Sequence, residues 1–99
     1  MKLYLDTSSN QKTVVKLDNK TLEVDSREWH SQVVLPMLKK LLGRRPLSVI
    51  TEIEVNPGPG SFTGLRVGAA IANALGFALK IPVNGKNVTR LDIVEPQYE

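Results

Sequence analysis

The sequence predicts an α/β domain in which a mixed sheet packs against two helices, with the element order β-β-β-α-β-α-β. Three observations lead to this prediction. Apolar residues alternate early in the chain, they recur at helical spacing in the middle, and a long apolar helix follows a loop rich in glycine and proline. At 99 residues the chain is one domain. We expect a folded lobe over residues 1–85 and a C-terminal tail over 86–99, which carries one added strand.

The first three elements are strands. Lys2 to Asp6 alternates between apolar and polar residues, as a half-buried strand does. Lys12 to Leu17 and Thr21 to Asp25 lie on either side of the short polar turn Asp18-Asn19, which is typical of a hairpin. The three segments therefore predict an antiparallel meander.

The first helix is expected to begin at Ser26 or Ser31, because either residue can cap a helix, and to end at Gly43. Pro36 must lie in its first turn or else kink it. Further strands are predicted before and after the second helix, at Ile50 to Val55 and at Ile81 to Val83. The apolar stripe of the first helix comprises Val33, Val34, Met37, Leu38, Leu41 and Leu42.

The second helix is apolar nearly all round, and Gly64, Gly68, Ala72 and Gly76 recur at every fourth residue along it. A ridge of small residues lets another helix approach closely. A helix that is apolar on all sides is expected to be buried on all sides, and a chain this short can hardly cover it alone. We therefore predict that a second subunit covers part of it. The alternative is that it is simply the central core helix of the domain.

The loop before this helix suggests a second kind of site. A helix N-terminus with free N–H groups attracts anions, and a cation such as Arg66 in the first turn calls for an anionic partner. The anion-binding candidates are Gly60, Ser61, Thr63, Gly64 and Arg66, with Ser61 or Thr63 also able to cap the helix. The alternative is that the loop only turns the chain and Arg66 extends into water. The sequence fits neither a P-loop nor a dinucleotide-binding fingerprint.

Composition excludes several functions. Without cysteine there is no disulfide or thiolate chemistry, and without a signal-like N-terminal segment we expect a cytoplasmic protein with no membrane contact. The net charge of +3 comes from scattered residues, so direct nucleic-acid binding is not indicated. No catalytic or metal-binding residue is predicted. His30 is the only histidine, and Ser8, Ser9 and Ser61 have no positioned base.

The element order resembles that of ribonuclease H-like folds and of each half of actin-like ATPases. A nuclease of that type needs several carboxylates around two metals. This chain has Asp6 on the first strand, but only Glu28 at the start of the first helix and Asn56 after the fourth strand. The loop over residues 7–10 carries hydroxyls but lacks the glycine of an actin-like phosphate turn. Neither activity is therefore expected.

Three segments resemble the TsaB family, also called YeaZ: GPGSFTGLRVG over residues 58–68, KLYLDTSS near the N-terminus, and WHSQVVLPMLKKLL in the first helix. The resemblance covers about residues 1–85. It implies a non-catalytic subunit that binds and activates TsaD, the enzyme that completes threonylcarbamoyladenosine at position 37 of tRNA. No cofactor is then bound tightly, ATP is used by the wider complex, and TsaE joins the assembly. Contact with tRNA is indirect.

The resemblance also implies an interface. In this family the two helices of the N-terminal half form a helical bundle across the subunit boundary, with TsaD or, for the subunit alone, with a second copy. Full-length members carry a second lobe, whereas this chain ends at Glu99, so we expect an internal loss of that lobe. The alternative function is a stand-alone nucleotide- or anion-binding protein. The expected interface residues are Val33, Val34, Met37, Leu38, Gly64, Leu65, Gly68, Ala69, Ala72, Leu75 and Gly76.

Overall fold

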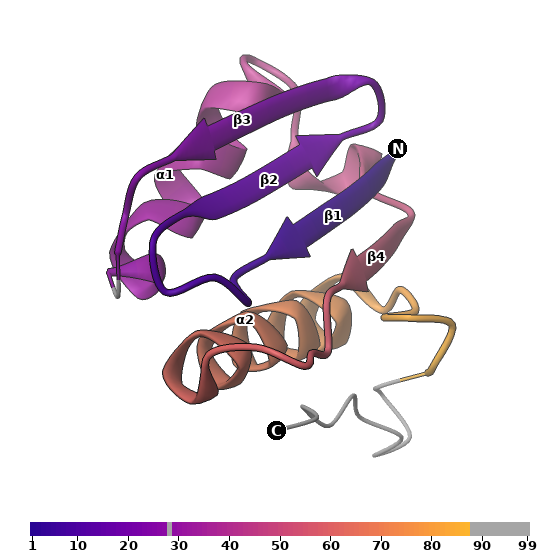
Figure 1. Cartoon of the computed structure of the whole chain (residues 1–99). Helices are drawn as coiled ribbons and strands as arrows, with labels where there is room; N and C mark the ends of the chain where they lie inside the picture. Colours follow the sequence, from indigo (N-terminus) through magenta and orange to yellow (C-terminus); the bar gives the residue numbers. More distant parts are fainter. Residues whose placement is uncertain (28, 88–99) are drawn as a thin grey trace.

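The computed structural model describes residues 1–27 and 29–87. Four strands form one mixed sheet in the order β3-β2-β1-β4 (Figure 1). The strands are β1 (Lys2–Asp6), β2 (Thr13–Leu17), β3 (Lys20–Val24) and β4 (Glu52–Val55). The predicted meander and the fourth strand are confirmed, with ends that differ by up to two residues from the expected ones.

The sheet combines two kinds of pairing. β2 is antiparallel to both β1 and β3, whereas β1 and β4 are parallel. Val83 forms a single parallel bridge to Ile53, so the expected strand at Ile81 to Val83 is reduced to one bridge on the far side of β4. The weak strand expected over 88–94 lies outside the described residues.

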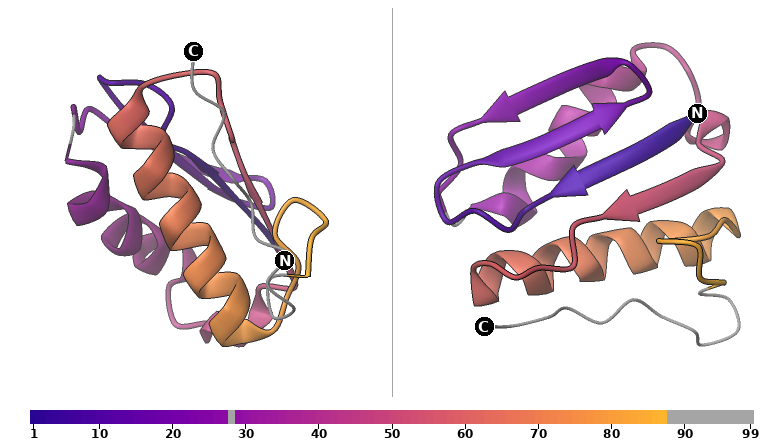
Figure 2. Two further views of the ribbon diagram at one scale, coloured as in Figure 1. Left: turned by 90° about the horizontal axis from the view of Figure 1, so that it is seen from below. Right: turned by 45° about the vertical axis from the view of Figure 1, so that its right-hand side comes forward.

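Two helices cover one face of this sheet, as the left-hand view in Figure 2, seen from below, shows. Helix α1 (His30–Leu42) packs on β2 and β3, and α2 (Phe62–Leu79) packs on β4 and β1. A short 3-10 turn, η1 (Leu47–Val49), leads from α1 toward β4. This arrangement leaves the other face of the four strands to solvent in the described part of the chain.

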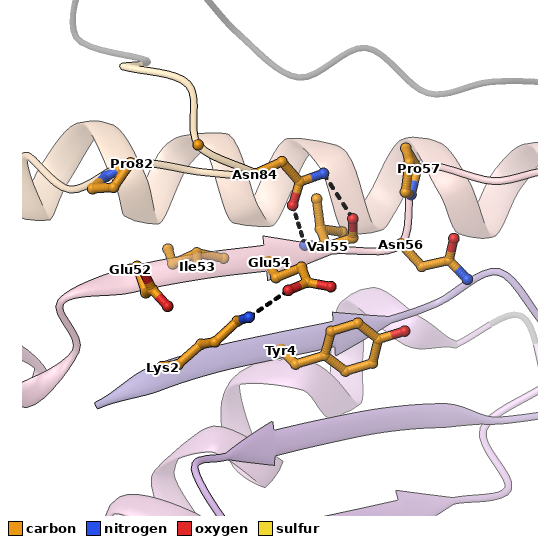
Figure 3. A pocket seen from close by; sticks show the side chains of 11 residues that line it. Lys2, Tyr4, Glu52, Ile53, Glu54, Val55, Asn56, Pro57, Pro82 and Asn84 are labelled. Carbon is orange, nitrogen blue, oxygen red and sulfur yellow. Dashed lines mark hydrogen bonds and ion pairs between the residues drawn. The ribbon is translucent and has the colours of Figure 1, made fainter.

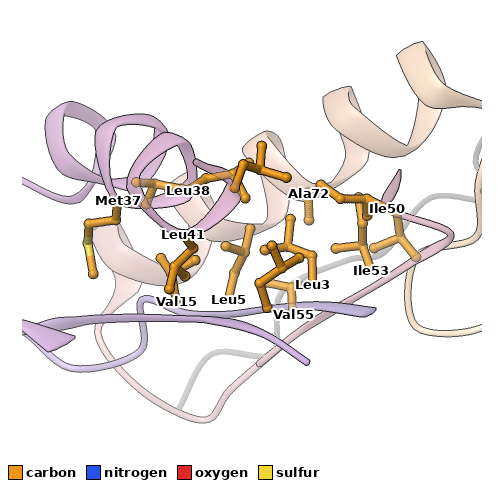
Figure 4. Packing of buried hydrophobic residues seen from close by; sticks show 14 residues of the cluster. Leu3, Leu5, Val15, Met37, Leu38, Leu41, Ile50, Ile53, Val55 and Ala72 are labelled. Atoms are coloured by element: carbon orange, nitrogen blue, oxygen red, sulfur yellow. The ribbon is translucent and has the colours of Figure 1, made fainter. Parts of the chain in front are cut away.

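The core forms between the helices and the inward side chains of the strands (Figure 4). Because strand side chains alternate, β1 contributes Leu3 and Leu5 to this face, and β4 contributes Ile53 and Val55. The buried set is completed by Val15, Leu17, Val34, Met37, Leu38, Leu41, Leu42, Ile50, Ala72 and Val83.

Helix α1 starts differently from the prediction. Its N-cap is Trp29, with no side-chain cap hydrogen bond, so neither Ser26 nor Ser31 caps it. Pro36 lies inside the helix rather than in its first turn. The helix ends at Gly43 as predicted, with a φ of 63° that glycine adopts without steric cost.

The outer face of the sheet is charged. Lys2 pairs with Glu54 at 2.6 Å, and Lys12 pairs with Glu23 at 2.9 Å. Figure 3 shows the first pair beside Tyr4, at a hollow between the sheet and the loop around Asn84. The hydrogen bond and the charge of Glu54 raise the pKa of Lys2, and partial burial raises the pKa of Tyr4. These pairs are consistent with a solvated surface.

Candidate partner-binding surface

The loop before α2 is held by the loop that follows β1. Asp6 Oδ1 accepts hydrogen bonds from Ser8 and from the side-chain amide of Asn56, and Ser61 N donates to Ser8 O. Gly60 lies so close that an added Cβ would stand 2.6 Å from Ser8 O. The polar residues Asp6, Ser8 and Asn56 therefore connect the ends of β1 and β4 to the start of α2.

Ser61 caps α2, as one of the two predicted alternatives stated. Its Oγ accepts a hydrogen bond from Gly64 N at 3.4 Å, so this hydroxyl satisfies one of the first-turn donors. Arg66 is exposed and lies over the Phe62 ring, 5.5 Å from its centroid. Thr63 is exposed and Gly60 faces Ser8. Anion binding by these residues stays a prediction.

The small-residue ridge of α2 faces the chain's own sheet. A Cβ on Gly64 would stand 2.0 Å from Thr7 O, and one on Gly68 would stand 2.2 Å from Thr7 Oγ1. Thr7 Oγ1 donates a hydrogen bond of 2.6 Å to Gly64 O. Ala72 is fully buried. The ridge therefore allows α2 to approach the end of β1, and it is not open to a helix of another subunit.

Most of the predicted interface residues share this inward orientation. Val34, Met37 and Leu38 of α1 and Leu65, Ala69 and Gly76 of α2 are buried within the chain, while Val33 and Leu75 are half-buried. The physical reason is that both helices turn their closest-packed faces toward the sheet. Packing on a sheet needs the same small and apolar residues that packing on another subunit would need. Most of these side chains therefore pack within the chain, and their contact with another subunit stays a prediction.

Within the single chain α2 is not buried on all sides, which agrees with the expectation that a chain this short cannot cover it alone. Only a third of its residues are buried. Phe62 and Phe77 are 56% and 61% exposed, and Ala70, Ala74 and Ala78 between and beside them are exposed as well. By length and composition α2 could also span a membrane, a test that core helices of soluble proteins pass too.

These exposed residues define an outward face of α2. Ala70, Ala74 and Ala78 recur at every fourth residue, which is the spacing of the buried ridge on the opposite side. Leu35 of α1 is 54% exposed and lies about 200° around the helix from Val33, on the flank of α1 away from β3. We call this surface, made by Leu35, Phe62, Arg66, Ala70, Ala74, Phe77 and Ala78, the outward face.

The sequence prediction missed the outward face, although a signal for it was present. Three alanines at a spacing of four, with a phenylalanine near each end, form a second small-residue ridge in the same helix. The prediction used the first ridge because that ridge contains three glycines. The helical period does not determine which of the two ridges packs against the chain's own sheet.

His30 is a buried packing residue at the start of α1. Its Nδ1 lies within hydrogen-bond distance of Thr13 Oγ1 and 3.4 Å from Ser26 Oγ. An added Cβ on Gly64 would stand 3.2 Å from Nε2, so the ring fills the space between the starts of α1 and α2. Among residues 1–27 and 29–87, no group of three His, Cys, Asp or Glu side chains could hold a metal ion.

Comparison with known proteins identifies the family. A family model described as tRNA N6-adenosine threonylcarbamoyltransferase (TsaD) matches residues 23–94. The curated protein named tRNA threonylcarbamoyladenosine biosynthesis protein TsaB from Buchnera aphidicola subsp. Schizaphis graminum is 33% identical over 88 residues, and the protein of that name from Escherichia coli K12 is 34% identical over 89. The chain belongs to the TsaB (YeaZ) family.

A solved TsaB-family structure has the same fold. YeaZ from Pseudomonas aeruginosa superimposes with a TM-score of 0.71 at 33% identity, over 83% of this chain and 41% of that one. The predicted ribonuclease H-like fold, one half of an actin-like ATPase, is thereby confirmed. Each of the two TsaB matches above covers 84% of this chain, which spans 42% of the Buchnera protein and 38% of the Escherichia coli protein.

Proposed function

We propose that this chain is a non-catalytic scaffold subunit that binds and activates TsaD in the synthesis of threonylcarbamoyladenosine on tRNA. The relatives named TsaB and the match to the TsaD family model support the pathway. The outward face supports a binding role, since Phe62, Phe77 and Leu35 are each more than half exposed. Contiguous exposed apolar surface on a soluble domain usually marks a contact with another molecule.

The shape of the outward face suits a helix of the partner. The small side chains of Ala70, Ala74 and Ala78 allow a close approach of two backbones, and the two phenylalanines near the ends supply apolar area. Arg66 lies beside Phe62 at the N-terminal end of the outward face. TsaD is the partner that we propose, and a second copy of the chain covers the same face when TsaD is absent.

The test is the mass in solution of the purified chain, alone and mixed with TsaD of the same organism. We expect a homodimer that exchanges into a heterodimer with TsaD, and a rise in threonylcarbamoyl transfer by TsaD. Ala70→Arg places a long charged side chain in the middle of the outward face. It should weaken the homodimer and the heterodimer with TsaD by about 2–4 kcal/mol each. Thr21→Arg, on the outer face of the sheet, is the matched control.

The proposal is wrong if Ala70→Arg and the control bind TsaD equally well while both remain folded. A monomer that neither binds TsaD nor changes its activity would also exclude it. Substitutions in the buried ridge cannot test TsaD binding, because a change such as Gly68→Leu would disrupt the chain's own packing against Thr7 whether or not a partner is present.

A further inference from the structure

A second surface lies on the other flank of α1, between that helix and the edge strand β3. The hollow is lined by apolar side chains of both elements together with Gln32 and Lys40. β3 is the last strand of the sheet, with β2 as its only neighbour in the described residues. We call this hollow the β3 groove; its apolar lining comprises Leu22, Val24, Val33, Pro36 and Met37.

The edge of β3 offers unpaired backbone groups to this groove. Leu17 and Lys20 flank the two-residue turn, and Asp18 in that turn has the positive φ of 51° found in mirror-image hairpin turns. The flanking pair in such a hairpin exchanges hydrogen bonds, and bonded and non-bonded pairs then alternate along the strands. Leu22 therefore bonds to β2, whereas the backbone groups of Thr21 and Glu23 point away from the sheet.

The groove is basic at one end. Lys20 is on the same side of β3 as Leu22 and Val24, because strand side chains alternate. The chain just after α1 lies at this end too, since Arg45 contacts Met1 at the start of β1 and Asp18 N bonds to Lys2 O. Lys20, Lys40 and Arg44 are all exposed.

No carboxylate of the described residues neutralises these cations. The ion pairs found there join Lys2 to Glu54 and Lys12 to Glu23, both on the outer face of the sheet. Asp18, the acidic residue nearest to Lys20 in the chain, directs its Oδ1 to Lys2 N. An acidic partner group would therefore find cations without a competing carboxylate.

We propose that the β3 groove binds an extended segment of a partner protein, which adds a strand to the free edge of β3. Alternate apolar side chains of this segment would cover Leu22 and Val24, and carboxylates at one end would meet Lys20 and Lys40. Edge strands recognise peptides in this way, with backbone hydrogen bonds for affinity and pockets for alternate side chains. The apolar lining favours a peptide over RNA, which would be held by the cations alone.

The test uses a fluorescein-labelled nine-residue peptide in which valine alternates with threonine and two glutamates stand at one end. A second peptide carries the glutamates at the other end, and a third carries lysines in their place. We expect one glutamate peptide to bind at micromolar to millimolar concentration, with amide shifts in NMR spectra at Thr21 and Glu23. The glutamates must lie at the basic end of the groove, so the peptide that binds shows in which direction the added strand runs.

Two variants make the proposal falsifiable. Lys40→Glu should weaken binding of the glutamate peptide by about tenfold and restore some binding of the lysine peptide. Thr21→Pro removes an outward N–H, which edge strands tolerate, and should abolish the peptide-induced shift of the Glu23 amide. Lys16→Glu, on the outer face of the same sheet, is the control and should bind normally.

The proposal is overturned if the glutamate and lysine peptides bind equally well, or if no peptide binds. It is overturned too if the amide shifts fall on α2 or on the outer face of the sheet. It is also overturned if only a single-stranded RNA or a second copy of the chain occupies the groove. The outward face is on the other flank of α1, so Thr21→Pro should leave TsaD binding intact. If the unsubstituted chain binds the peptide but does not bind TsaD, the proposed function alone is refuted.

Discussion

Gly64 is the position where α2 approaches β1 most closely, and Gly64→Ala tests that contact. The added Cβ would stand 2.0 Å from Thr7 O, and the obstacle is backbone that cannot rotate away. Helix and strand must then separate by at least about 1 Å to relieve the overlap. The 2.6 Å hydrogen bond from Thr7 Oγ1 to Gly64 O would lengthen to about 3.6 Å, which is no longer a hydrogen bond.

Three contributions decide the net effect. Overpacking costs about 1–3 kcal/mol, and leaving the buried hydroxyl without its acceptor costs a similar amount. Alanine favours the helix by only about 1 kcal/mol over glycine. We therefore expect Gly64→Ala to lower the free energy of unfolding by about 3 kcal/mol, a large fraction of the ~5–15 kcal/mol of a typical domain. The melting temperature should fall by about 12–24 °C.

The assay is thermal and urea unfolding followed by circular dichroism. Lys39→Gly on the exposed side of α1 is the control, and it should cost about 1 kcal/mol through lower helix propensity and the loss of a cation in the last turn. Gly68 provides an independent check, because its added Cβ would meet Thr7 Oγ1, at 2.2 Å, rather than backbone. Thr7→Ala with Gly68→Ala should therefore be no less stable than Thr7→Ala alone. A Gly64→Ala variant as stable as the wild type would refute the reasoning.

Three further predictions concern smaller contacts. Thr7→Val removes the buried hydrogen bond to Gly64 O and should cost about 1–3 kcal/mol in urea unfolding. Asn84→Ala removes two hydrogen bonds, at 2.8 and 2.9 Å, by which the side chain pairs with the backbone of Val55 at the edge of β4; we expect a loss of about 1–2 kcal/mol and faster exchange of the Val55 amide hydrogen. Partial burial and nearby carboxylates raise the pKa of Tyr4 above its ordinary value of 10.0, so the folded state favours the neutral phenol. Stability linked to Tyr4 is therefore fully present below pH 10 and lost as the pH rises through the higher folded-state pKa, and Tyr4→Phe should remove that alkaline loss.

Several features of this domain could be predicted from local sequence. Alternation of apolar residues located the hairpin and β1, because a half-buried strand has a period of two. Ser61 was one of two candidate caps for α2, and Gly43 was predicted to end α1, because capping depends on a few adjacent residues. The start of α1 could not be predicted in this way, since Trp29 precedes it without a side-chain cap.

The sequence by itself determined the family, the order of the first four strands and two helices, and the presence of small-residue ridges in α2. The tertiary structure alone decided which ridge is used inside the domain. Gly64 and Gly68 meet Thr7 because β1 lies beside β4 and both helices cover one face of the sheet. Helical periodicity specifies which residues share a side, but not what that side touches. The contact depends on strand order, which brings together residues more than fifty positions apart.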